Sequence, residues 1–248
     1  MNNYELLPGE EIYDLLIHDL KIIQHREEFR FSLDAILLAH FAFVRPGIKA
    51  VDLGTGSGVI GLLLLARGAG SVIGVELNRR VASMAERSIA LNGLAARMAI
   101  LPADLRLVQQ ELPAGQAELV TSNPPYRPVG HGALNPHDHV AMARHELTAN
   151  LDDVIAAARH LLKYRGRFAM VHLPERMTEV LGKLSAAGLE PKRLQLVYPK
   201  LGSKPNMLLV EAIRGAKPGL EVLPPFLVYH QDGTYTDAVM AYYKQVKT

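Results

Sequence analysis

The 248-residue sequence contains no cysteine and no long apolar run, and both absences exclude whole classes of protein. Without cysteine, the chain has neither a disulfide framework nor a thiolate metal site. The longest uninterrupted apolar stretch, Val59 to Ala66, is far shorter than the roughly 20 residues of a membrane-spanning helix. Residues 1–11 carry acidic side chains and lack the basic-then-apolar pattern of an export signal. We therefore expect a cytoplasmic protein that does not enter a membrane.

An excess of charge of one sign is also lacking. The formal net charge is +2, so the field of the whole molecule does not attract a polyanion. A nucleic-acid partner therefore requires local clusters of basic side chains. Because 49% of the residues are hydrophobic and 21% are charged, the composition favours one ordinary α/β core, and we expect a single domain over residues 1–248.

Apolar segments with alternating strand and helix periodicity predict a parallel sheet with helices on both faces, a doubly wound α/β fold. The expected strands are residues 50–53, 71–76, 97–101, 117–122 and 167–172. The expected helices are residues 59–66, 81–91, 151–162 and 175–187. Gly166 and Gly188 stand where helix C-caps are expected. Residues 190–198 and 206–213 predict an antiparallel hairpin that closes the sheet.

The amino-terminal part, residues 1–45, departs from this alternation and predicts a hairpin-plus-helix extension. Residues 13–24 favour two short strands around a break at His18-Asp19. Ser32 is a candidate N-cap, with Asp34 in the first turn of a helix that ends near Phe43. This extension either covers a ligand pocket, with Phe29, Phe31 or Asp34 near it, or packs as an ordinary structural element.

A glycine-rich stretch, Val51-Asp52-Leu53-Gly54-Thr55-Gly56-Ser57-Gly58, follows the strand expected at residues 50–53. Such a turn between strand and helix lets backbone lie against a ligand without interference from side chains. The formal Gly-x-Gly-x-x-Gly match that ends at Gly61 keeps a nicotinamide or flavin enzyme open. However, the carboxylate of Asp52 repels a pyrophosphate and suits a cation. S-adenosylmethionine, which carries an ammonium and a sulfonium, fits that preference.

Two further acidic residues end the next strands. Glu76 lies about 20 residues after the turn, where a carboxylate can accept hydrogen bonds from both ribose hydroxyls. Asp104 follows the third strand and is placed for an adenine amino group. Doubly wound sheets bind ligands at the carboxyl ends of their strands. The expected cofactor-binding residues there are Asp52, Gly54, Thr55, Gly56, Gly58, Glu76 and Asp104, with Asn123 of the next motif beside them.

The glycine-rich stretch resembles the cofactor motif of class I S-adenosylmethionine methyltransferases, and Asn123-Pro124-Pro125-Tyr126 resembles the signature of those that act on planar nitrogens. The resemblance implies a Rossmann-like, seven-stranded sheet whose last strand is antiparallel, in agreement with the closing hairpin. Residues 29–39 and 143–146 are similar to the bacterial valine-tRNA adenine-N6 methyltransferases, although Ser32-Leu33 replaces the Gly-Thr of that pattern. Members of that group modify the adenosine beside the anticodon, so a tRNA partner is implied.

The tetrapeptide suits this chemistry because the exocyclic amine of adenine is a poor nucleophile, its lone pair being delocalised into the ring. The Asn123 side-chain oxygen and the Pro124 carbonyl can each accept one amine hydrogen and so turn the lone pair toward the sulfonium methyl. Tyr126 is expected to stack on the target base. Pro124 and Pro125 fix the backbone before the substrate arrives. We therefore expect Asn123, Pro124, Pro125 and Tyr126 to be the catalytic residues.

The same tetrapeptide leaves other acceptors open. Glutamine N5-methyltransferases of release factors share it but carry a helical domain ahead of the core, whereas about 45 residues precede the glycine turn here. Adenine-specific DNA methyltransferases usually need a separate target-recognition domain, and no room for one is visible in this sequence, which disfavours that alternative. A ribosomal-RNA guanine-N2 methyltransferase stays open, as does an idle cofactor-binding or RNA-binding module, which the intact Asp52, Glu76, Asn123 and Tyr126 disfavour.

Residues 127–146 contain four histidines at irregular spacing, with no carboxylate pair or cysteine to complete a metal site, so we expect no metal. This loop is either a mobile lid with Arg127 and Arg144 near phosphates, or Arg144-His145-Glu146 caps the next helix. In the last hairpin loop, Lys200 and Lys204 are further candidates for phosphate contacts. The expected substrate-binding residues are Tyr126, Arg127, Arg144, Lys200 and Lys204.

Overall fold

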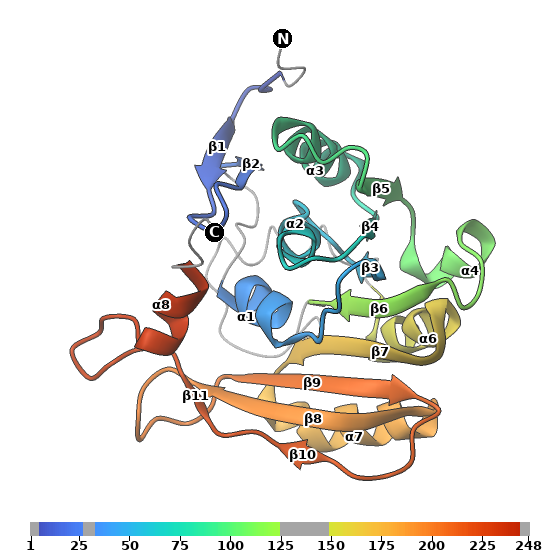
Figure 1. The fold of residues 1–248 in the computed structure, drawn as a ribbon, viewed down its shortest axis with the longest axis vertical. Coiled ribbons are helices and arrows are strands. Elements are labelled where there is room, and N and C mark those ends of the chain that lie inside the picture. The colour runs from blue at the N-terminus through green and yellow to red at the C-terminus, as the bar shows by residue number, and fades with distance from the viewer. Residues whose placement is uncertain (1–4, 27–32, 125–148, 244–248) are drawn as a thin grey trace.

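The computed structural model describes residues 5–26, 33–124 and 149–243, and its centre is a single nine-stranded sheet (Figure 1). The strand order is β10-β8-β9-β7-β6-β3-β4-β5, with β11 paired to β8. The strands are β3 (Lys49–Leu53), β4 (Ser71–Glu76), β5 (Met98–Pro102), β6 (Ala117–Ser122), β7 (Leu162–His172), β8 (Leu189–Tyr198), β9 (Met207–Arg214), β10 (Glu221–Val222) and β11 (Phe226–Leu227).

The strand directions confirm the predicted seven-stranded, doubly wound arrangement in β3 to β9. Strands β5, β4, β3, β6 and β7 are parallel to one another. Strand β9 is antiparallel to both of its neighbours, β7 and β8, so β8 runs with the parallel strands. The carboxyl ends of β3, β4, β5, β6, β7 and β8 therefore meet at one edge of the sheet.

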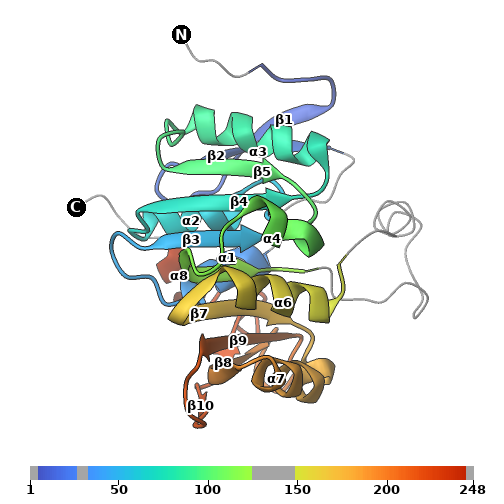
Figure 2. The ribbon, with the colours of Figure 1, turned by 90° about the vertical axis from the view of Figure 1, so that its right-hand side faces the viewer.

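Helices cover both faces of the sheet. Helices α1 (Leu33–Phe41), α2 (Val59–Ala66) and α3 (Arg79–Leu91) share one buried core cluster with the sheet. Helices α4 (Val108–Glu111), α6 (Leu151–Leu161) and α7 (Met177–Ala186) lie on the opposite face (Figure 2). The 3-10 turns η1 (Leu105–Leu107) and η2 (Pro174–Arg176) precede α4 and α7, and α8 (Asp237–Tyr243) follows β11. Within β7, Ala169 and Val171 join the first cluster and Phe168 and Met170 the second, as expected for a strand covered on both sides.

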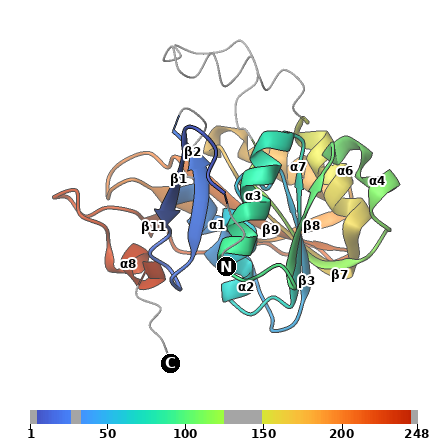
Figure 3. The same cartoon turned by 90° about the horizontal axis from the view of Figure 1, so that it is seen from above.

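The predicted amino-terminal hairpin is confirmed, with strands β1 (Glu10–Asp14) and β2 (Lys21–His25) paired antiparallel. Figure 3 shows it beside α3. The Ile23 amide donates to the Ser88 hydroxyl of α3 at 2.9 Å, and the Gln24 side chain donates to the Ser57 hydroxyl of the glycine-rich stretch at 3.3 Å. The extension therefore contacts the glycine-rich stretch before α2 as well as α3.

Two details of the second half differ from the sequence-based expectation. Gly166 does not cap a helix: α6 ends at Leu161 and the chain continues at once as β7, which contains Gly166. Gly188 does follow the end of α7 in the left-handed conformation, at φ 73°. The short elements β10, β11 and α8 were not predicted, because two-residue strands leave no periodicity in the sequence.

A buried carboxylate joins the end of α1 to the sheet. Glu211 of β9 is fully buried and accepts hydrogen bonds from Arg167 of β7 at 2.5 Å and from the Phe43 amide at 2.8 Å. Arg193 of β8 lies 3.4 Å from the same carboxylate. The guanidinium groups of Arg167 and Arg193 also lie over the rings of Phe43 and Phe41, at 4.3 and 4.8 Å. This network fixes where α1 lies on the sheet.

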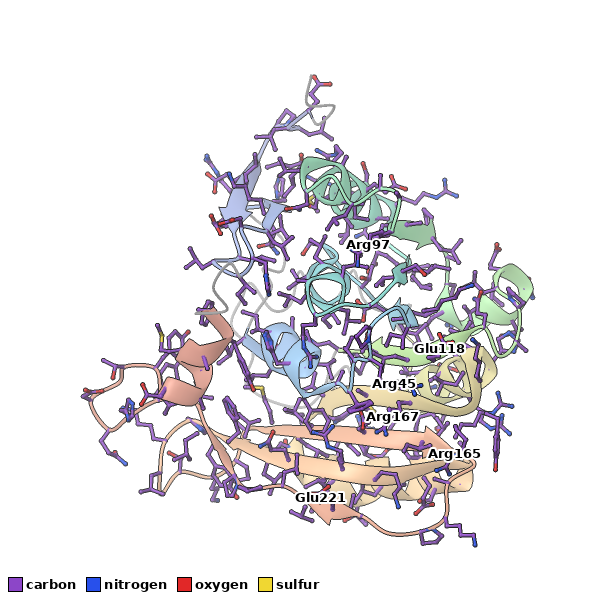
Figure 4. All side chains as sticks on the ribbon, in the orientation of Figure 1. Arg45, Arg97, Glu118, Arg165, Arg167 and Glu221 are labelled. Atoms are coloured by element: carbon purple, nitrogen blue, oxygen red, sulfur yellow. The ribbon has the colours of Figure 1, made fainter. Side chains whose placement is uncertain are left out.

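We predict that Glu211→Gln lowers the free energy of unfolding by about 3 to 5 kcal/mol, because it leaves two partly desolvated guanidinium groups without their counter-charge. The matched control is Glu221→Gln, at an exposed position of β10 that Figure 4 labels on the outer strand, and it should change stability by about 0.5 kcal/mol or less. Urea denaturation of the two variants measures the difference. Equal midpoints would show that the network does not hold α1.

Candidate functional site

The residues predicted for a cofactor and for a reaction come together at the carboxyl edge of the sheet. Strand β3 is paired with β4 on one side and with β6 on the other. Asp52 and the glycine-rich turn end β3, Glu76 ends β4, and Asn123 follows β6 directly. Three adjacent strands therefore deliver these residues to one place.

The turn after β3 leaves an open backbone surface. Gly54, Gly56 and Gly58 have positive φ angles of 70°, 56° and 86°, a region that favours glycine. A Cβ atom added at Gly54 or Gly56 would meet no atom within 4 Å. A ligand can therefore lie directly on the backbone of this turn.

Three backbone amides of the turn already donate hydrogen bonds to other groups of the protein. The Gly54 and Thr55 amides donate to the Val75 carbonyl at 2.9 and 3.0 Å, and the Gly56 amide donates to Glu76 Oε2 at 2.9 Å. A pyrophosphate site needs several amides directed at the anion. Since these three amides are already engaged, the turn does not support the dinucleotide interpretation of its glycine spacing.

The turn rests on β4 through a close approach at Gly74. A Cβ atom at Gly74 would lie 2.7 Å from Thr55 Cγ2 and 2.9 Å from Thr55 Oγ1 and Ile100 Cδ1. Thr55 itself is 6% exposed. Glycine at position 74 therefore makes room for Thr55 and sets the height of the turn above the sheet.

Asp52 is a fully buried carboxylate beneath the turn. Its Oδ1 accepts a hydrogen bond from the Thr121 hydroxyl of β6 at 2.6 Å, while Oδ2 has no hydrogen-bond partner among the residues that the structure describes. Burial raises the pKa of Asp52 to about 6, although the hydroxyls of Thr121 and Thr55 oppose this rise; the Thr55 hydroxyl lies near the carboxylate without the geometry of a hydrogen bond. A buried carboxylate oxygen without a partner, below an open turn, fits a positively charged ligand such as S-adenosylmethionine.

Glu76 and Asp104 both lie at the carboxyl edge of the sheet, but their carboxylates have different hydrogen-bond partners. Each Glu76 oxygen accepts one backbone amide, Oε2 from Gly56 and Oε1 from Asn78, and a carboxylate oxygen can accept a second bond. Asp104 is bonded through both oxygens to the Arg106 side chain, which lowers the pKa of the Asp104 carboxyl. Glu76 therefore keeps acceptor capacity toward a ribose, whereas a base amine would share Asp104 with Arg106.

The reaction motif is anchored by α1. The Asn123 Nδ2 atom lies 3.2 Å from Asp34 Oδ2, in the first turn of that helix. An ionised carboxylate only accepts hydrogen bonds, so it selects the NH₂ end of the asparagine amide and turns Oδ1 the other way. Asp34 is 8% exposed and Pro124 is buried. The sequence offered Asp34 as one of three residues near the pocket, with ordinary packing as the alternative, and nothing in its spacing linked it to a residue 89 positions later.

Several predicted site residues fall outside the described ranges, among them Pro125, Tyr126, Arg127 and Arg144, together with Phe29, Phe31 and the histidines of residues 127–146. Lys200 and Lys204 lie in the loop between β8 and β9, at the same edge as the site. The Lys200 ammonium donates to the Gln231 carbonyl at 3.2 Å, and Lys204 is exposed. Over residues 5–26, 33–124 and 149–243, no group of three potential metal ligands is present, and none of the helices there is both long and apolar enough to cross a bilayer.

Comparison with known proteins gives consistent results. Residues 34–187 match the family model of the methyltransferase small domain. The chain is 31% identical to the tRNA1(Val) (adenine(37)-N6)-methyltransferase of Tolumonas auensis over 76% of this chain and 78% of that protein. It is 30% identical to the protein of the same name from Aeromonas hydrophila, over 84% and 86% of the two chains. A crystal structure of a predicted O-methyltransferase from Agrobacterium tumefaciens superposes with a TM-score of 0.67 at 25% identity, covering 85% of this chain and 95% of that one.

The raised pKa of Asp52 predicts a pH dependence of stability. Because the carboxyl keeps its proton up to about pH 6 in the folded protein but loses it near pH 3.8 when unfolded, its contribution to stability falls as pH rises between these values. Asp52→Asn should not show this fall. Denaturation at pH 4 to 7 should therefore show the wild type losing about 3 kcal/mol relative to the variant. Parallel pH curves for the two proteins would contradict the raised pKa.

Gly74→Ala should weaken S-adenosylmethionine binding about tenfold or more, because the new methyl group displaces Thr55 and with it the glycine turn. Gly182→Ala is the matched control, since a Cβ there, on the outer surface of α7, meets nothing within 4 Å. Titration calorimetry gives both affinities. Unchanged affinity in Gly74→Ala would mean that the height of the turn does not govern binding.

Proposed function

The chain belongs to the family of tRNA1(Val) (adenine(37)-N6)-methyltransferases, and from this premise we propose that it methylates the exocyclic N6 of an adenosine in the anticodon loop of a valine tRNA. It is an S-adenosylmethionine-dependent methyltransferase. The observation that carries the choice of a nitrogen acceptor is the oriented Asn123 amide, at the same edge as the open glycine turn. We assign this reaction to one domain over residues 1–248 and to the cytoplasm, where a tRNA substrate is available.

The donor side of the site is built from the ends of β3, β4 and β5. We propose that the methionine part lies on Gly54 and Gly56, where the backbone surface is open. Asp52 then acts through the turn, because a charge in a low-dielectric interior attracts a cation more strongly than one in water. Glu76 is proposed to accept the ribose hydroxyls, and Asp104 to share its carboxylate between Arg106 and the adenine amine.

The acceptor side is built from Asn123 and Pro124. We propose that Asn123 Oδ1 and the Pro124 carbonyl each accept one hydrogen of the N6 amine, so that its lone pair faces the donor. When bound, S-adenosylmethionine supplies the electrophilic methyl group, and the electron pair of the broken carbon–sulfur bond stays on sulfur. The methylated nitrogen, which carries the positive charge, then releases one hydrogen as a proton to solvent water. Holding the two reactants in line accounts for about 7 to 11 kcal/mol of the barrier in well-oriented reactions.

The RNA side rests on basic residues at the same edge. Lys200 and Lys204 are proposed to contact phosphates, and the same role is proposed for Arg127 and Arg144, with Tyr126 stacking on the target base. A base in an anticodon loop is already partly exposed, so its extrusion costs little. Because phosphate contacts release counterions, RNA affinity should fall steeply with salt.

The function is tested by incubating the protein with methyl-labelled S-adenosylmethionine and, separately, bulk tRNA, ribosomal RNA or a peptide-chain release factor. Digestion of the labelled product to nucleosides should yield N6-methyladenosine from tRNA. Label in the release factor would identify a glutamine N5-methyltransferase, and label in guanosine of ribosomal RNA a guanine-N2 enzyme. Donor binding without transfer to any of the three would leave a binding module.

We predict that Asn123→Ala lowers kcat about 100-fold or more, because it removes an acceptor that holds the amine in the transition state. Asp34→Asn should give a smaller loss of kcat. An amide at position 34 can hydrogen-bond to either the NH₂ or the oxygen of Asn123, so it no longer selects one orientation of that side chain. Titration calorimetry should show unchanged donor affinity for both variants. Wild-type turnover by Asn123→Ala in the radiolabel assay would refute the role of that residue.

A further inference from the structure

A pocket of about 250 Å³ opens beside the reaction motif, at the same edge of the sheet. Its walls come from the first turn of α1, from the loop between β8 and β9, and from the chain just after β11. Asp34 lines this pocket and also holds the Asn123 amide. An occupant of the pocket therefore lies one side chain away from the residue proposed to hold the target amine.

Residues 226–243, here called the carboxyl-terminal segment, hold the aromatic wall of this pocket in place. The amides of Val228 and Tyr229 donate to the carbonyls of Tyr198 and Pro199, both at 2.9 Å, and so extend the pairing of β11 with β8. The ring of Tyr229 stacks on Tyr235 at 5.1 Å with an interplanar angle of 14°. These contacts hold the Tyr229 ring in place before any ligand arrives.

The same segment is tied to α1, so both walls of the pocket belong to one packed unit. The rings of His40 and Tyr242 stack at 3.9 Å, and Tyr242 lies 5.8 Å from Phe226. Figure 1 shows α8 and β11 on the side of the sheet that α1 covers. The pocket is therefore a fixed feature of the fold at this edge.

The chemistry of the lining matches a nucleobase. Leu33, Pro199 and Met207 supply apolar surface, and Tyr229 supplies an aromatic ring. Asn206 is exposed and makes no side-chain hydrogen bond among the described residues. Its amide has the donor and the acceptor that pair with a base edge, and proteins read single-stranded RNA by combining such pairs with aromatic contacts.

The basic residues around the pocket suit the negatively charged phosphate backbone of an RNA whose base enters the pocket. Lys200 and Lys204 lie in the same loop as Pro199 and Asn206. Asp34 is the one acidic residue in the lining, and it is engaged with Asn123. The lining contains no basic side chain that would bind a free anion. A nucleotide, by contrast, would place its base in the pocket and its phosphate toward Lys200 and Lys204.

We propose that this pocket receives a base of the substrate RNA adjacent to the target adenosine and so contributes to the choice of substrate. The inference rests on the proposed function, because it takes the substrate to be RNA. It goes beyond that function by assigning Asn206 and Tyr229 to a second base. The reacting adenine is assigned to Asn123 and Pro124, neither of which lines the pocket.

A first experiment locates the neighbouring base directly. Substrate RNA carrying 4-thiouridine at either position next to the target adenosine is cross-linked to the wild-type protein, and the modified peptide is identified by mass spectrometry. We expect cross-links in residues 199–207 or 226–235 from one of the two positions. Cross-links confined to other segments, from both positions, would overturn the proposal.

A second experiment measures what the pocket contributes. Asn206→Ala and Tyr229→Leu should each raise the KM for RNA about 5- to 150-fold, the range for loss of one base contact, with kcat and donor affinity unchanged. Ser203→Ala in the same loop and Tyr164→Ala, an exposed tyrosine of β7, are the matched controls and should keep the wild-type KM.

The two experiments separate failure of this inference from failure of the proposed function. A wild-type protein that methylates RNA while Asn206→Ala and Tyr229→Leu match the controls would refute the second base alone. A wild-type protein that methylates no RNA would refute the proposed function as well. Thermal unfolding of both variants guards against loss of fold, and Asn206→Ala, at an exposed loop position, should unfold like the wild type.

Discussion

The site depends on one short hydrogen bond between neighbouring strands. The Thr121 hydroxyl of β6 donates to Asp52 Oδ1 of β3 at 2.6 Å, in the fully buried layer beneath the edge. Two residues beyond this pair lie Gly54 and Asn123, the first residues after β3 and β6. Because both ends leave the sheet next to this bond, it fixes the position of the glycine turn, where we propose the donor, relative to Asn123, which we propose holds the acceptor. Burial raises the pKa of Asp52 to about 6, so the fixed position of this carboxylate comes with a desolvation penalty.

A second fixed point comes from outside the parallel core. Helix α1 is held at its end by Glu211 and its arginine partners, and at its start it places Asp34 against Asn123. The helix therefore carries orientation from the antiparallel strand β9 to the reaction motif. The carboxyl-terminal segment packs on the same helix and completes the edge with a pocket. Elements at both ends of the chain thereby shape one site.

The sequence was sufficient for the parts of the fold that repeat a pattern. Strands β4 and β6 and helix α2 have the predicted bounds, because buried apolar runs end sharply at glycine or polar residues. The prediction that Gly166 caps a helix was wrong. Glycine is common both after helices and inside strands, and only the pairing of β7 with β6 shows that Gly166 lies in a strand. The tail after residue 215 was missed because its short strands are defined by their pairing with β8 and not by their own composition.

The candidate site divides in the same way. Asp52, Glu76 and the glycine turn follow from their places at strand ends, and the structure brings them together at one edge. The roles of Thr121, Gly74 and Asp34 did not follow, since each depends on a contact with a residue distant in sequence. Tyr126, Arg127 and Arg144 lie outside the described residues, so their roles stay predictions.

The most direct test of this account is a crystal structure with a substrate adenosine and an unreactive donor analogue that carries an amino group in place of the sulfonium methyl. The account predicts the analogue on the backbone of Gly54 and Gly56, with that amino group about 3 to 3.5 Å from N6 and Asn123 Oδ1 within hydrogen-bond distance of N6. An analogue bound elsewhere, or an Asn123 amide turned away from the adenosine, would contradict it.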